Sequence, residues 1–138
     1  MSQTATFLTD EWFILLQQAL ASEPAEVLPQ QINMVANIEA RNGPSGSHAQ
    51  SHQQFGNSRM LWSPGSAANP DVTFIMDYET LRAGWLGLPG STGWDAYQAG
   101  KIEVVASSWW VWNDLALVGE SLFPSDAGAL QRVRAITA

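Results

Sequence analysis

The sequence contains no cysteine, and it has six basic residues against thirteen acidic ones, a formal net charge of −7. The lack of cysteine excludes a disulfide framework, a thiolate metal site and a cysteine nucleophile. The shortage of lysine and arginine leaves few groups to neutralise phosphates, which argues against nucleic-acid binding. The acidic excess also disfavours docking on anionic membrane surfaces.

Long apolar runs are missing as well. No run approaches the roughly 20 apolar residues of a membrane-spanning helix. The N-terminal residues lack the basic and apolar regions of a secretory signal. We therefore expect no membrane insertion and a cytoplasmic location. Charged residues are only 14% of the chain and hydrophobic residues 46%, a composition that predicts a single folded domain over residues 1–138.

The first periodic segment predicts a helix over residues 10–21. Thr9 supplies a hydroxyl cap, and the acidic residues that follow it suit the positive end of a helix dipole. The apolar residues of this segment recur at helical spacing, which gives the helix one apolar face. They are Trp12, Leu15, Leu16, Ala19 and Leu20, with Phe13 and Ile14 widening the face.

Five further segments are predicted to be strands. Three of them alternate apolar and polar residues, as a half-buried strand does. A fourth is polar and rich in glutamine, and we interpret it as an edge or partner strand. The segments are 31–41, 48–55 (the polar one), 60–62, 71–76 and 101–106.

Two short helices are expected between the last two strands. Asp77 is placed to cap the first helix, which would bury Leu81, Trp85 and Leu86. The second helix spans residues 94–99, and Gly100 follows it where a left-handed conformation is wanted. The glycine-rich loop between these helices, Gly87–Gly93, is a candidate gate because glycine leaves it few ways to pack rigidly.

The stretch 100–112 ends in three tryptophans within four positions. After the strand, either Ser107 or Ser108 caps a helix, or the strand runs on through Trp112. We favour the helix because its apolar spacing persists for three turns. Its face would carry Val111, Leu115, Val118 and Leu122. A terminal helix then restarts near Pro124. The order of elements predicts an α+β domain, an antiparallel sheet with helices packed on one face.

Three segments resemble the sterol carrier protein type-2 family. They are Phe7–Trp12, the strand Asp71–Met76 ahead of a helix, and Ala96–Val104, which contains Gly-Lys-Ile as the last strand begins. The resemblance covers nearly the whole chain loosely. It implies a five-stranded, mostly antiparallel sheet covered by helices and enclosing an apolar cavity that holds a sterol, fatty acid or acyl chain. It implies no shared catalytic residues.

Aromatic side chains are the candidate lining of such a cavity, because indole rings are large and apolar and their N–H groups can orient a polar ligand group. For any one of them, ordinary core packing is the alternative. A small core that holds so many large rings is hard to fill without leaving a void. The ligand-binding candidates are Trp62, Phe74, Trp85, Trp94, Tyr97, Trp109, Trp110 and Trp112.

Signals for catalysis or metal binding are weak. His48 and His52 have the spacing of a helical metal pair, but they fall in an extended or irregular segment with no third ligand nearby, so no metal is expected. Asp77, Glu79 and Tyr97 are the groups available for acid–base chemistry. No nucleotide fingerprint is present, and no cofactor is expected.

Binding of an apolar small molecule in an aromatic-lined cavity is therefore the favoured function. The alternative is a small enzyme, a cyclase or isomerase of natural-product biosynthesis, that folds an apolar substrate in the same cavity. A third hypothesis is a homodimer formed through exposed tryptophans.

Overall fold

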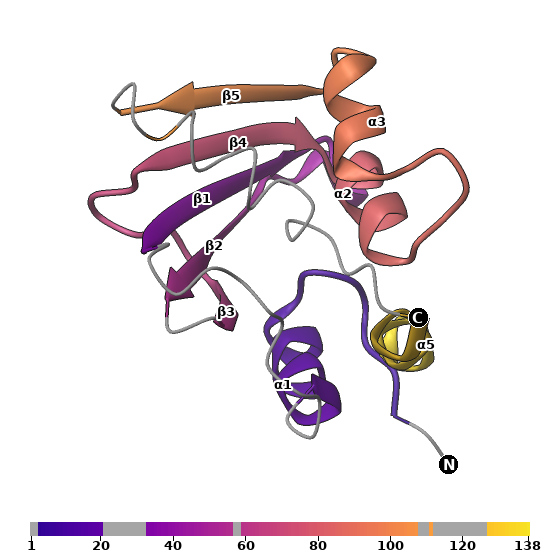
Figure 1. The fold of residues 1–138 in the computed structure, drawn as a ribbon. Coiled ribbons are helices and arrows are strands. Elements are labelled where there is room, and N and C mark those ends of the chain that lie inside the picture. Colours follow the sequence, from indigo (N-terminus) through magenta and orange to yellow (C-terminus); the bar gives the residue numbers. More distant parts are fainter. Residues whose placement is uncertain (1–2, 21–32, 57–58, 108–110, 112–126) are drawn as a thin grey trace.

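The computed structural model describes residues 3–20, 33–56, 59–107, 111 and 127–138. Within them the chain forms a five-stranded sheet and a set of helices (Figure 1). In chain order the elements are α1 (Asp10–Leu20), β1 (Met34–Arg41), the 3-10 helix η1 (Pro44–Gly46), β2 (Ala49–Gly56), β3 (Arg59–Pro64), β4 (Val72–Asp77), α2 (Tyr78–Trp85), α3 (Gly93–Gln98), β5 (Ile102–Ala106) and α5 (Ala127–Ile136).

The sheet has the strand order β3-β2-β1-β4-β5. β1, β2 and β3 form an antiparallel meander, and β4 pairs with β5 antiparallel. β1 and β4 run parallel, and β2 and β3 together make the long connection that a parallel pair requires. The register sets Ile38 opposite both Ser51 of β2 and Phe74 of β4. The expected α+β class, with a mostly antiparallel five-stranded sheet, is confirmed.

One face of the sheet is buried, and we call it the inner face. Successive strand residues point to opposite faces, and β1 and β4 accordingly alternate between buried and more exposed residues. On β5, Val105 faces outward and is 52% exposed. The apolar residues of the inner face are Met34, Ala36, Ile38 and Ala40 from β1, Val72, Phe74 and Met76 from β4, and Ile102, Val104 and Ala106 from β5.

Helices α1 and α5 pack against each other on one side of the sheet, and α1 also contacts β3 (Figure 1). α2 packs on β4 and β1, and α3 packs on β5. In α1 the side chains of Trp12, Phe13 and Leu16 are buried, whereas Ile14 is 58% exposed. The prediction that Ile14 widens the buried face is wrong, because α5 and β3 meet α1 on the side that carries Trp12 and Leu16.

Most helix ends follow the expected capping signals. Thr9 Oγ1 accepts a hydrogen bond from the Trp12 amide at 3.2 Å, which caps α1. Gly100, after α3, has a φ of +73°, as predicted for a left-handed glycine. At the start of α3, Thr92 and Asp95 form a capping box. These local patterns therefore identify where α1 begins and where the turn after α3 lies.

Asp77 is the exception. It occupies the N-cap position of α2 but its side chain makes no capping hydrogen bond. Its carboxylate instead accepts from Asn42 Nδ2 at 2.8 Å. The predicted side-chain cap is wrong because β1 and β4 end side by side, and the residue after β1 takes up this carboxylate.

Two strand interpretations are also settled by the topology. β2 is an interior strand, paired with both β1 and β3, and not an edge. β5 ends at Ala106, and Val111 is helical and fully buried, so the helix alternative holds at the position described. The other positions on the predicted helix face lie outside the described residues. None of the helices in the described part of the chain has the length and apolar character that crossing a bilayer requires.

Candidate functional site

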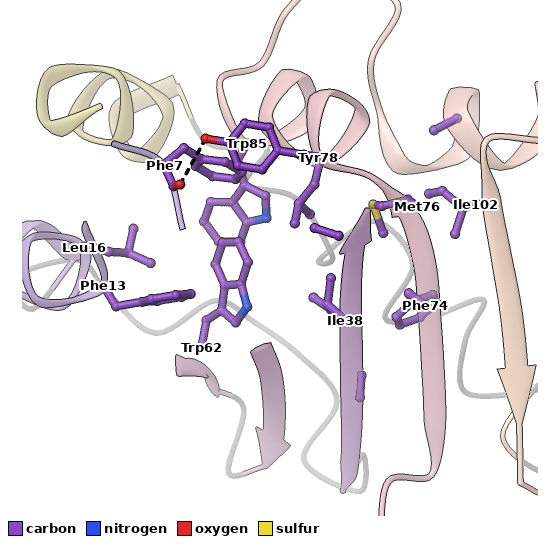
Figure 2. Close-up of a cluster of buried hydrophobic side chains, with 14 of the residues drawn as sticks. Phe7, Phe13, Leu16, Ile38, Trp62, Phe74, Met76, Tyr78, Trp85 and Ile102 are labelled. Atoms are coloured by element: carbon purple, nitrogen blue, oxygen red, sulfur yellow. Dashed lines mark hydrogen bonds between the residues drawn. The ribbon is translucent and has the colours of Figure 1, made fainter. Parts of the chain in front are cut away.

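Between the sheet and the helices lies a group of aromatic side chains that we call the aromatic cluster (Figure 2). Trp62 of β3 and Trp85 at the end of α2 stack, with ring centroids 4.4 Å apart and 28° between the ring planes. The other pairs meet edge to face, an arrangement that suits the ring quadrupoles. The members are Phe7, Trp12, Phe13, Trp62, Tyr78 and Trp85.

Three polar atoms of the aromatic cluster have hydrogen-bond partners in other segments of the chain. Because the cluster is buried, each of these bonds removes a desolvation penalty and also fixes a ring orientation. The bonds run from Trp62 Nε1 to Ser51 Oγ at 2.8 Å, from Trp12 Nε1 to Thr137 Oγ1 at 2.9 Å, and from the Tyr78 hydroxyl to the Phe7 carbonyl at 3.0 Å.

Trp85 differs from its neighbours. Its side chain is 1% exposed, and its Nε1–H has no acceptor among the described residues. A buried donor left without an acceptor costs about 1–3 kcal/mol. A buried donor of this kind calls for an acceptor beyond the described residues.

Two polar side chains of β2 also lie on the inner face. Ser51 is 2% exposed and Gln53 is 0% exposed. Among the described residues, no other polar or charged side chain is buried. Gln53 stands opposite Trp62 in the strand register. Sequence reasoning missed both, because the segment 48–55 is polar on its two faces and alternation cannot identify the inward positions. Phe55, on the same face, was the available signal.

The predicted ligand-binding residues separate into four groups. Trp62, Phe74 and Trp85 lie in the interior, the two tryptophans in the aromatic cluster and Phe74 on the inner face. Tyr97 in α3 is 44% exposed. Trp94 belongs to α3, but its side chain is not among those described. The residues outside the described part of the chain are Trp109, Trp110 and Trp112.

The tryptophans whose side chains are described are buried, so they offer no surface for the hypothetical homodimer. Trp12, Trp62 and Trp85 are each at most 3% exposed. A tryptophan-mediated dimer therefore stays a prediction that depends on other residues.

The three groups considered for acid–base chemistry lie away from this interior. Asp77 and Glu79 are exposed at the start of α2, and Tyr97 is on the surface of α3. The structure therefore brings none of the three into the aromatic cluster. Tyr78, between Asp77 and Glu79 in the chain, is the ionisable group that enters the cluster, where burial raises its pKa above the ordinary 10.0.

The two histidines are placed apart from the aromatic cluster. His52 Nδ1 lies 2.8 Å from the Gly65 carbonyl oxygen, which requires a proton on Nδ1. His48 is exposed just before β2. Across the described ranges, no three histidine, cysteine, aspartate or glutamate side chains are grouped as a metal ion would need.

The predicted gate loop is anchored where it begins. Arg134 of α5 donates from Nε to the Leu86 carbonyl at 2.7 Å and from Nη2 to the Gly87 carbonyl at 3.3 Å. Leu88, Pro89 and Gly90 beyond it are exposed. These bonds tie the first residue of the loop to α5, and the gate stays a prediction.

Comparison with known proteins identifies the fold. No protein-family model matches the sequence, and no curated protein matches it. A crystal structure of sterol carrier protein 2 matches with a TM-score of 0.63 at 14% identity, covering 95% of this chain and 99% of that chain. The chain has the sterol carrier protein 2 fold.

Other structures agree with this assignment. The apo form of sterol carrier protein 2 from Yarrowia lipolytica matches with a TM-score of 0.55 at 15% identity, covering 96% of this chain and 98% of that chain. A palmitated SCP2L2 from Aedes aegypti matches with a TM-score of 0.52 at 24% identity, covering 81% of this chain and 92% of that chain. The resemblance stated from the sequence is confirmed for the fold. The aromatic cluster lies between the sheet and the helices of this sterol carrier protein 2 fold.

Proposed function

We propose that this chain, acting as a single domain over residues 1–138, binds an apolar small molecule between the inner face of the sheet and the helices. The observation that carries the proposal is the match to sterol carrier protein 2 over nearly the full length of both chains. The palmitated Aedes aegypti protein shares this fold, and it supports an acyl chain as the kind of ligand that fits.

The chemistry of the inner face supports the same function. Its residues on β1, β4 and β5 are all apolar, and Ile38, Phe74 and Val104 follow one another across three neighbouring strands. A ligand alkyl chain buried on such a surface gains about 0.8 kcal/mol for each CH₂ group removed from water. The aromatic cluster, at the β2 and β3 side of the sheet, would close the other end of the site.

Native mass spectrometry of the protein as purified tests this function first. We expect an extra mass in the native spectrum that is lost on denaturation and belongs to an apolar molecule. Titration with a fluorescent alkyl probe would then give an affinity. A protein that carries no such mass and binds no alkyl probe would contradict the proposal.

Neighbouring positions on β5 provide a matched pair of variants. Val104 faces inward opposite Phe74, and Val105 faces outward and is 52% exposed. Val104→Trp should fill the ligand space and weaken probe binding at least about tenfold, a loss of about 1.4 kcal/mol. Val105→Trp should leave binding unchanged. Equal probe affinities for the two folded variants would place the ligand elsewhere.

A further inference from the structure

The polar groups in the described interior are all neutral. Trp85 Nε1–H has no acceptor among the described residues, and Trp62, stacked on it, donates to Ser51 Oγ. Gln53 stands opposite Trp62 in the register and is 0% exposed. In Figure 2 the nitrogens of the two stacked rings lie on the side toward β1 and Ile38. The Trp85 donor is therefore directed to the inner face of the sheet.

Basic side chains are absent from the described interior. Five of the six basic residues have described side chains, and all five are exposed or half-buried: Arg41, Arg82, Lys101, Arg132 and Arg134. The sixth, Arg59, is the first residue of the edge strand β3. The segments outside the described residues contain no lysine, arginine or histidine. Neither the described interior nor those segments offers a lysine, arginine or histidine side chain to a buried ligand anion.

These observations favour a neutral ligand head group over an anionic one. An anion buried without a cationic partner carries a large desolvation penalty, whereas a neutral oxygen needs only a donor. The formal net charge of −7 further disfavours the approach of an anion. A single indole N–H provides the donor that a neutral oxygen requires.

We propose that the interior selects a neutral lipid with an acceptor oxygen, such as an ester, ketone or hydroxyl, over an ionised fatty acid. Trp85 Nε1 donates to that oxygen, and the hydrocarbon part of the ligand lies along the inner face. This selectivity rests on the proposed function, because it describes the head group of the ligand that the same site binds.

Three ligands of similar length test the selectivity: methyl dodecanoate, dodecanoate and tridecane. Each is delivered from cyclodextrin at about pH 8, where the carboxyl group is ionised, and measured by displacement of a fluorescent alkyl probe. The unmodified protein should bind methyl dodecanoate at least about tenfold more tightly than dodecanoate. Trp85→Phe should weaken methyl dodecanoate binding about tenfold, the value of one net hydrogen bond, and leave tridecane within about twofold.

Trp12→Phe is the matched control, since Trp12 belongs to the same cluster but its Nε1–H is already bonded to Thr137. It should leave the ratio of ester to alkane affinity unchanged. Dodecanoate binding as tightly as its ester, or Trp85→Phe weakening ester and alkane equally, would overturn the selectivity while the proposed function stands. Failure of all three ligands to displace a bound probe would also overturn the selectivity alone, whereas failure of the probe itself to bind would count against the proposed function. If Trp85→Phe does not fold, the ester and carboxylate comparison on the unmodified protein decides.

Discussion

Tyr78 shows how one side chain joins distant segments. It is the first residue of α2, it is 6% exposed, and its hydroxyl donates to the Phe7 carbonyl at 3.0 Å. Burial raises its pKa above 10.0, the Arg82 charge lowers it by a smaller amount, and the Glu79 charge adds slightly to the rise. The hydrogen bond requires the protonated hydroxyl, so loss of this proton breaks the link between α2 and the N-terminal segment.

A pH dependence of stability follows at the same scale. Because the pKa of Tyr78 is higher in the folded state, the folded chain keeps a proton that the unfolded chain releases, and the free energy of unfolding falls as pH rises above about 10. Below that pH the contribution is fully present. Urea unfolding measures the free energy of unfolding at about pH 8 and about pH 10.5. The decrease between the two pH values should be smaller for Tyr78→Phe than for the unmodified protein. Equal losses would show that another group governs this pH range.

Among the elements, the contact between α5 and the end of α2 positions the loop that follows α2. Gly87 has a φ of +65°, and a Cβ placed there would lie 2.8 Å from Leu130 Cδ2 and 3.0 Å from Arg134 Nη2. Gly90, in the same loop, has a φ of +70° and nothing within 4 Å of the same position. The two glycines have similar positive φ angles, and their surroundings differ.

Alanine at these two glycines separates backbone strain from contact. Gly90→Ala should cost about 1–2 kcal/mol of unfolding free energy, since it adds only left-handed strain. Gly87→Ala should cost at least about 1 kcal/mol more, because Leu130 must move and the Arg134 hydrogen bonds are disturbed. Urea unfolding of the two variants measures the difference. Equal costs would mean that α5 does not hold this loop in solution.

At the scale of the whole molecule, hydrogen bonds join the two ends of the described chain. Trp12 Nε1 donates to Thr137 Oγ1 across 125 residues of sequence. Ala5 also receives the Ala138 amide on its carbonyl and donates its own amide to the Ile136 carbonyl, both at 2.9 Å. These bonds join the segment before α1 to the segment after α5, and they hold the two helices together beneath the sheet.

A double-mutant cycle tests this closure. Thr137→Val should cost about 1–3 kcal/mol, because it leaves the buried Trp12 N–H without an acceptor. In the Trp12→Phe background the same change should cost much less, which gives a coupling energy of about 1–2 kcal/mol. Urea unfolding of the four proteins provides the cycle. Additive effects of the two substitutions would show that the hydrogen bond does not contribute to stability.

Local periodicity in the sequence was sufficient to determine much of the fold. Alternation identified β1, β4 and β5 as half-buried strands, and helical spacing identified Trp12 and Leu16 as residues of the apolar face of α1. Thr9 and Gly100 marked a helix start and a turn. These features depend on residues two to four positions apart, so they are legible without knowledge of the rest of the chain.

The tertiary structure alone decided which of these residues meet. Trp62 and Trp85 stack only because β3 and the end of α2 come together, and no pattern within either segment indicates the other. The inward direction of Ser51 and Gln53 depends on β2 pairing on both sides, and that pairing is absent from their local pattern. The Asp77 carboxylate does not cap α2, because it accepts a hydrogen bond from Asn42. The parallel pairing of β1 and β4 brings Asn42 next to it. Long-range strand pairing determined which polar side chains lie in the interior. A sequence periodicity of two or 3.6 residues carries no information about that pairing.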